Sequence, residues 1–165
     1  MRVEVQVDLG EANALFDRLI KAGLNPAPFL RAAGEYGVDS TRERFRISRA
    51  PDGSPWAPNS LVTIQRYGSR FSSGRSKKPL IGETRALSTT IFYRFVGSNA
   101  VEIGSPMEYA AVHQFGAAKG SFGATSRGAP IPWGNIPARP FWGLSDKDRK
   151  ELEALLVDYL EDNSA

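Results

Sequence analysis

The sequence contains no cysteine and only one histidine, His113, among its 165 residues. The absence of thiols excludes disulfide bridges, thiolate metal sites and cysteine nucleophiles. A lone histidine cannot form a metal site without partners at ligand spacing, and no local cluster of acidic residues supplies them. The chain also lacks a phosphate-binding glycine loop, a pair of catalytic carboxylates and an HExxH pattern. We therefore expect no enzymatic activity, no metal and no cofactor.

Long hydrophobic runs are absent as well. No apolar run approaches the roughly 18 residues that span a bilayer, and residues 1–5 lack the apolar centre of a signal peptide. We therefore expect a soluble protein that is made in the cytoplasm and has no membrane partner. Hydrophobic residues make up 41% of the chain and charged residues 24%, which is ordinary for a globular protein. The length predicts one domain, residues 1–165.

Charge is distributed unevenly, although the net charge is only +3. Residues 42–85 hold ten bases and three acids, whereas residues 146–162 hold seven acids and three bases. Separate regions of opposite charge suit head-to-tail contacts between identical subunits, or a basic surface that faces DNA. Two solvated surfaces without any partner explain the same counts equally well. The candidate DNA-facing loop contains Arg66, Arg70, Arg75, Lys77 and Lys78.

Glycine and proline are abundant, with 16 and 11 residues, and they concentrate in two stretches without periodic hydrophobicity. We predict two long extended loops there, residues 50–79 and 117–137. Hydrophobic periodicity and capping signals predict the remaining elements. These are a strand over 2–8, a helix ending at Gly23, a helix from Pro28 buried as far as Ile47, a hairpin of strands 89–96 and 100–104, a short helix closed by Gly116, and a last helix after a capping box at Ser145–Asp148. This order predicts an α+β fold, with helices packed on a small antiparallel sheet.

Two glycines, Gly34 and Gly37, interrupt the predicted long helix. Glycine lowers helix propensity, so we expect either a close crossing by another element or a bend at this point. Residues 139–142 have the composition of a short edge strand.

Two motifs combine an aromatic anchor, a glycine or proline that shapes the backbone, and one polar side chain. They are Tyr109-Ala-Ala-Val-His-Gln-Phe-Gly116 and Ile136-Pro-Ala-Arg-Pro-Phe141. This chemistry favours a rigid corner that packs or docks. We expect the His113 ring to bond backbone carbonyls or the 136–141 segment, and Arg139 to form an ion pair within or between subunits. The candidate interface residues are Trp56, Tyr109, His113, Phe115, Arg139 and Phe141, although Trp56 and Phe141 suit a core position as well.

Together with Asp52-Gly-Ser-Pro-Trp-Ala-Pro58 and Leu80-Ile-Gly-Glu-Thr-Arg-Ala-Leu-Ser88, the two motifs resemble the phage virion morphogenesis family, the Mu-like and P2-like tail-completion proteins. The resemblance runs from about residue 10 to about residue 160. It implies a structural virion protein that completes the tail or joins head to tail, as a ring at the head-proximal end of the tail.

The resemblance also implies partners. They are further copies of the chain, in a ring expected to be a hexamer, neighbouring tail terminator, tube or neck connector proteins, and genomic DNA in the lumen. It places the protein in the virion, and in the host cytoplasm during assembly. Two other functions stay open at this point: a non-specific DNA-binding module outside the virion, and a hydrolase that uses His113 with a carboxylate.

Overall fold

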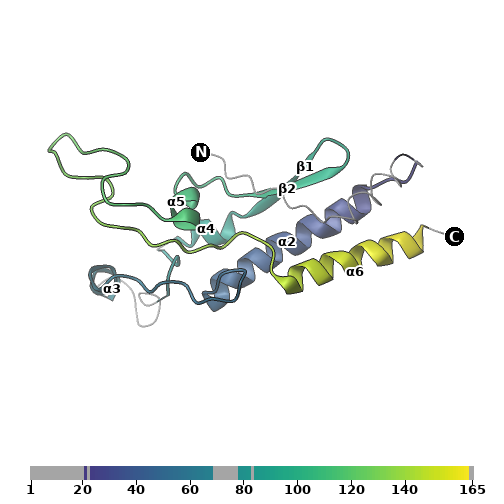
Figure 1. Cartoon of the computed structure of the whole chain (residues 1–165), viewed down its shortest axis with the longest axis horizontal. Coiled ribbons are helices and arrows are strands. Elements are labelled where there is room, and N and C mark those ends of the chain that lie inside the picture. The colour runs from purple at the N-terminus through teal and green to yellow at the C-terminus, as the bar shows by residue number, and fades with distance from the viewer. Residues whose placement is uncertain (1–20, 22, 69–77, 83, 164–165) are drawn as a thin grey trace.

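The computed structural model describes residues 21, 23–68, 78–82 and 84–163, so the predicted strand over 2–8 and nearly all of the first predicted helix lie outside the described residues. The described part is elongated (Figure 1). The long helix α2 (Ala27–Ile47) is its central element and contacts both the hairpin of β1 and β2 and the last helix α6 (Asp146–Asp162).

Helix α2 begins as the sequence predicts, with a proline in its first turn, where the missing N–H removes no helical hydrogen bond. Its buried side includes Phe29, Ala33 and Phe45. The prediction that this side continues to Ile47 is wrong, because that side chain is 44% exposed. The buried stripe runs through positions 37, 41 and 44–45, and the next position along it is 48, where the helix has already ended.

The predicted hairpin is confirmed as two antiparallel strands, β1 (Phe92–Val96) and β2 (Ala100–Gly104), joined through Gly97. The first strand begins three residues later than predicted, because the chain before it forms the short helix α4 (Ala86–Thr89). The register pairs Phe92 with Gly104 and Val96 with Ala100. Helices packed on a small antiparallel sheet make this an α+β fold, as predicted.

The two glycines of α2 mark the place where the hairpin crosses the helix closely. A Cβ added at Gly34 would lie 2.5 Å from the Tyr93 ring, and one at Gly37 would lie 2.1 Å from Cδ1 of Ile103. Both of these hairpin side chains pack against the core cluster around Phe45. The sequence left open a close crossing or a bend, and the structure shows the close crossing.

We expect Gly34→Ala to destabilise the protein by about 1–3 kcal/mol, because the Tyr93 ring would have to leave its place between helix and sheet. Gly134→Ala is the matched control, since a Cβ at Gly134 meets nothing within 4 Å. Urea unfolding of the two variants measures the difference. Equal midpoints would show that the hairpin can move away from α2 without cost.

Helix α6 starts with the predicted capping box, in which the Ser145 hydroxyl accepts from the Asp148 N–H and the Asp148 carboxylate accepts from the Ser145 N–H. The apolar stripe of α6 packs on the first half of α2, where Leu156 and Tyr159 meet Phe29, Leu30 and Ala33. Each large side chain buried in this way stabilises the fold by about 1.5–3 kcal/mol.

The second core cluster lies around the end of α2 and contains three aromatic rings. The Phe45 ring lies 5.3 Å from the Trp56 ring and 5.3 Å from the Phe141 ring. The indole N–H of Trp56 donates to the carbonyl of Pro140 at 2.8 Å, which satisfies its polar atom inside the core. Segments before and after the hairpin are thereby held against the same helix.

The segment over 50–79 contains a helix that the sequence analysis missed, α3 (Leu61–Gly68). Ser60 lies just before it, and its hydroxyl accepts from the Thr63 N–H at 3.2 Å. With two turns only, α3 is too short for a periodic hydrophobic signal to stand out. In Figure 1 it lies beside the body, at the end of the molecule away from the chain's C-terminus. No helix in the described ranges has the length and apolar character needed to cross a bilayer.

Candidate functional site

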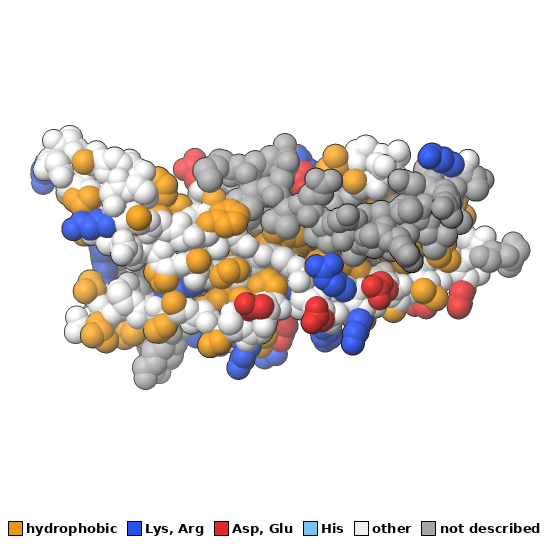
Figure 2. Space-filling model, in the orientation of Figure 1, with side chains coloured by type: hydrophobic (Ala, Val, Ile, Leu, Met, Phe, Trp, Pro, Cys, Tyr) orange, Lys and Arg blue, Asp and Glu red, His pale blue; other side chains and the backbone are white. Residues whose placement is uncertain are grey.

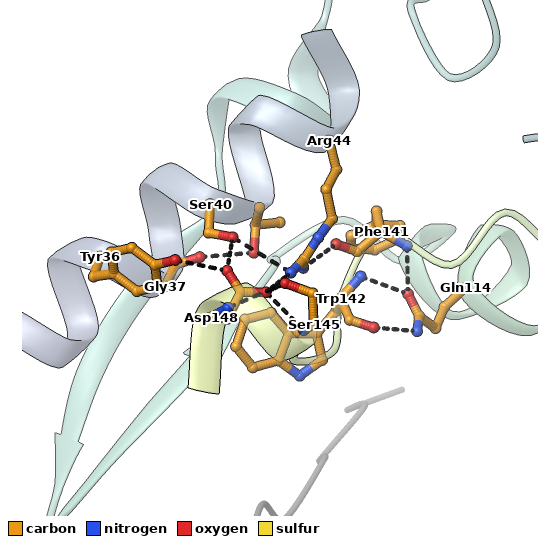
Figure 3. A network of polar contacts seen from close by, with 10 residues as sticks. Tyr36, Gly37, Ser40, Arg44, Gln114, Phe141, Trp142, Ser145 and Asp148 are labelled. Atoms are coloured by element: carbon orange, nitrogen blue, oxygen red, sulfur yellow. Dashed lines mark hydrogen bonds and ion pairs between the residues drawn. The ribbon is translucent and has the colours of Figure 1, made fainter. Parts of the chain in front are cut away.

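The two sequence motifs meet in space and form one corner, made of the short helix α5 (Ala110–Phe115) and the irregular segment 136–142. The Arg139 N–H donates to the His113 carbonyl at 2.8 Å. The Gln114 side chain accepts from the N–H groups of Phe141 and Trp142, both at 3.0 Å, and donates to the Trp142 carbonyl at 2.8 Å (Figure 3). The predicted edge strand over 139–142 is therefore wrong, because Gln114 takes the place of a neighbouring strand.

Gly116 closes α5 as predicted, although with a different backbone conformation. Its φ is 76° and its ψ is 176°, outside the left-handed helical region in which a glycine commonly closes a helix. A Cβ at this position would lie 2.8 Å from the Ala138 nitrogen and 2.8 Å from the Ile136 oxygen. Only glycine therefore allows the chain to pass this close to the 136–138 backbone.

His113 does not have the predicted ring contact at Nδ1, which is buried without a hydrogen-bond partner among the described residues. The ring lies edge-on to Tyr109, with the ring centroids 5.8 Å apart. Burial, followed by the positive charge of Arg139, lowers the pKa of His113 below its usual value. The main chain of His113, rather than its ring, holds the two motifs together. No described carboxylate bonds to Nδ1. The arrangement therefore does not support the hypothesis of a hydrolase that uses His113 with a carboxylate.

Arg139 is buried, and its guanidinium bonds backbone carbonyls instead of a carboxylate. Nε donates to the Ala57 oxygen at 2.7 Å and Nη2 donates to the Pro58 oxygen at 2.9 Å. No ion pair joins it to another described residue, so the prediction of an ion pair finds no support there. Arg139 thus fastens the proline-rich turn around Trp56 to the corner.

We expect Arg139→Ala to cost about 1–3 kcal/mol of stability, because it leaves two partly buried carbonyls without donors. Arg139→Lys should recover only part of the loss, since an ammonium cannot reach two carbonyls with the fixed fork of a guanidinium. Thermal unfolding followed by circular dichroism tests this order. An alanine variant as stable as the parent would mean that water replaces the guanidinium.

Two other candidate interface residues are also inside the subunit. Trp56 is 6% exposed and Phe141 is 5% exposed, and both rings pack on Phe45. Both residues therefore take the core position that the sequence also suited, with their surfaces covered by the chain itself. Tyr109 and Phe115, which are 44% and 62% exposed, remain available. Their docking role stays a prediction.

Residues 117–137 were predicted as an extended loop. Residues 117–136 of this segment form a folded projection that we call the arm. Its two sides are joined by antiparallel bridges between Ala117 and Ile136 and between Ala124 and Pro130. Phe122 N–H donates to the Ile131 oxygen at 2.8 Å, and further main-chain bonds continue the ladder. The arm projects from the body next to α5 (Figure 1). These main-chain bonds hold the arm in a defined shape without side chains, many of which are exposed.

The most exposed large hydrophobic side chains of the described residues gather at this end of the molecule. Leu61 is 77% exposed, Trp133 75%, Val62 72% and Phe115 62%. Together with Phe122, these residues form what we call the apolar pole; it comprises parts of α3, α5 and the arm, which lie at one end (Figure 1). Figure 2 shows hydrophobic side chains scattered over this end. The exposure of these large side chains makes this end of the molecule a candidate binding surface.

A cleft of about 310 Å³ lies between the hairpin and the corner. Its walls include Phe92, Ile103, Pro106 and Trp142, and the ion pair of Arg94 with Glu102 lies beside them. His113 does not line it. The described lining offers no nucleophile next to a base, so the cleft has the chemistry of an apolar contact site rather than a reaction centre.

The charge pattern of the sequence is partly internal to the fold. Arg44 and Asp148, one from the basic stretch and one from the acidic stretch, form a buried ion pair (Figure 3). Ser40 and Tyr36 also donate to Asp148, the latter at 2.9 Å. Burial raises the pKa of Asp148, but hydrogen bonds from Ser145, Ser40 and Tyr36 outweigh it and lower the pKa to about 2.

The candidate DNA-facing loop is described only at its ends. Arg66 on α3 and Lys78 are exposed, whereas Arg70, Arg75 and Lys77 lie outside the described residues. A DNA contact therefore stays a prediction. Within the described ranges, no group of three or more His, Asp or Glu side chains is placed to hold a metal ion.

A family model, described as the phage virion morphogenesis family, matches residues 7–161. Among individual relatives, the chain is 28% identical to the tail completion protein S of Escherichia phage P2, over 93% of this chain and 99% of that protein. It is 24% identical to the Mu-like prophage FluMu G protein 2 of Haemophilus influenzae, over 96% of each chain. It is 33% identical to the putative capsid assembly protein G of Escherichia phage Mu, over 70% of this chain and 67% of that protein. No solved structure matches.

The chain belongs to the phage virion morphogenesis family. The match confirms the resemblance drawn from the four motifs, and it covers all of the elements described above. A role in phage virion morphogenesis follows.

Proposed function

We propose that this protein completes the tail of a phage and joins it to the head, as a ring of identical subunits at the head-proximal end of the tail. The observation that carries the proposal is the similarity to the tail completion protein S of phage P2, which extends over 93% of this chain and 99% of that protein. The protein would act in the virion after assembly in the host cytoplasm.

The fold supports a joining role rather than a chemical one. A joint acts through contact, and the apolar pole offers exposed contact surface on three separate elements. The chemistry that the described residues bring together consists of packing and hydrogen bonds. Neighbouring tail or neck proteins and further copies of the chain are the proposed partners.

The test is a phage in which the gene for this protein is interrupted, propagated with and without the intact gene supplied in trans. Without it, electron microscopy should show filled heads and separate tails; with it, joined particles should return. Separate tails of normal length would show that the defect lies in the completion step, after the tail has reached its full length. Particles that join normally without the protein would contradict the proposal, and defective empty heads would favour a capsid-assembly role, as the name of the Mu relative states for that protein.

A DNA contact in the lumen is the second part of the proposal, and the exposed Arg66 and Lys78 support it. If the loop neutralises several phosphates, duplex binding by the purified protein should weaken steeply with salt, with a log–log slope of about −3 or steeper. A flat salt dependence would remove DNA from the list of partners.

A further inference from the structure

The second half of α6 presents an acidic surface that nothing in the described fold covers. Residues 151–162 contain five acids and no base. Glu153, Asp158 and Glu161 are exposed and surround Ala154 and Val157, the latter 51% exposed. Residues at spacings of three and four share one face of a helix, so these five side chains form a single surface, which we call the acidic stripe.

The apolar pole has the opposite character. The described residues of α3 and the arm carry Arg66, Lys119 and Arg127, all exposed, and these two elements contain no acid. Their exposed apolar groups include Trp133 and Phe122. The pole therefore combines aromatic anchors with a basic rim, whereas the acidic stripe combines a small apolar centre with an acidic rim.

The pole and the stripe lie at opposite ends of the described molecule (Figure 1), so one subunit cannot bring them together. Acidic side chains also line the part of Figure 2 that corresponds to α6, away from the arm. A contact between two different surfaces of identical subunits is heterologous, and it generates a ring when the rotation closes. Opposite charges at the rims steer association and set its register.

We propose that the apolar pole of one copy docks on the acidic stripe of α6 in a second copy, with Trp133 and Phe122 against Ala154 and Val157, and Lys119 and Arg127 facing Glu153 and Glu161. The proposal names the subunit contact of the ring proposed above and rests on that function. Other tail proteins would then contact the parts of the subunit outside the apolar pole and the acidic stripe.

The absence of cysteine permits a direct test in assembled particles. A chain with Ser121→Cys beside Phe122 and Ala154→Cys on the stripe should form a disulfide-linked ladder of oligomers under mild oxidation. Ser121→Cys with Asp39→Cys is the control, because Asp39 is exposed on α2 outside both surfaces. This control should stay monomeric on a non-reducing gel.

Charge reversal provides a second, independent readout. Glu153→Lys should lower incorporation of the protein into particles by about tenfold, and the added Lys119→Glu should restore it, since every copy then carries both reversed partners. The protein could be incorporated into infectious particles and yet give neither the disulfide ladder nor the rescue by charge reversal. This result would overturn the proposed contact and leave the joining role intact. Cross-links from Ser121→Cys to a different virion protein would also overturn it. Absence of the parent protein from the particles would instead defeat the proposed function.

Discussion

Replacing Asp148 by alanine should destabilise the subunit by about 3–5 kcal/mol, because the change leaves the buried Arg44 guanidinium without its counter-charge. The same carboxylate accepts from Tyr36, Ser40 and Ser145, so three further donors lose their acceptor. The ion pair also joins the middle of the chain to its last helix, and α6 is expected to loosen from α2.

Urea unfolding followed by circular dichroism measures the effect. Asp158→Asn, an exposed acid on the same helix, is the matched control and should change stability little. Replacing both partners, Arg44→Met with Asp148→Leu, should be much milder than either single change, because no unpaired charge remains buried. If the single and double variants were equally destabilised, lost packing rather than an orphaned charge would be the cause.

Asp148 also predicts how stability depends on pH. Its folded pKa is about 2, below the ordinary value of 3.8, so the charged form stabilises the fold. A lowered folded pKa contributes stability that is complete above the unfolded pKa and is lost as the pH falls through the folded one. The parent protein should therefore lose stability between about pH 4 and pH 2, and the Asp148→Ala variant should lack this part of the loss.

Local signals in the sequence predicted much of the fold. Alternation and turn residues around Gly97 predicted the hairpin, and the Ser145–Asp148 spacing predicted the start of α6. The two glycines of α2 marked the close crossing, because a side chain there would occupy the space of Tyr93 or Ile103. In each case the signal itself lies in residues near one another in the chain.

The features that were missed depend on distant residues. Arg44 and Asp148 are 104 positions apart, and nothing in either neighbourhood indicates the other. Gln114 was overlooked in favour of His113, because a neutral imidazole also has one donor and one acceptor. In the structure it is the Gln114 side chain that reaches the 141–142 backbone, where it donates to the Trp142 carbonyl and accepts from the Phe141 N–H. The arm was missed because residues 117–136 are rich in Gly, Ala, Ser and Pro and carry no alternation of hydrophobic and polar side chains.

Replacing Trp133 and Phe122 together by serine should abolish head–tail joining while leaving the subunit folded. Both side chains are largely exposed, so their loss removes little from the core. If they anchor an interface, each truncation should cost about 2 kcal/mol of binding or more, a factor of about 30 in association per side chain. Counts of joined particles by electron microscopy measure the loss of joining. Circular dichroism of the free subunit tests whether the variant is folded.

Val96→Ser is the control, because Val96 is 46% exposed at the hairpin turn, outside the apolar pole. It should leave joining intact, since exposure alone does not make a residue an anchor. Unfolding of the Trp133 and Phe122 variant would mean that the arm supports the corner rather than a partner, because the arm's base is bonded to it through Ala117 and Ile136. Normal joining by a folded variant would move the contact away from the arm, and the apolar pole would then be reduced to Leu61, Val62 and Phe115.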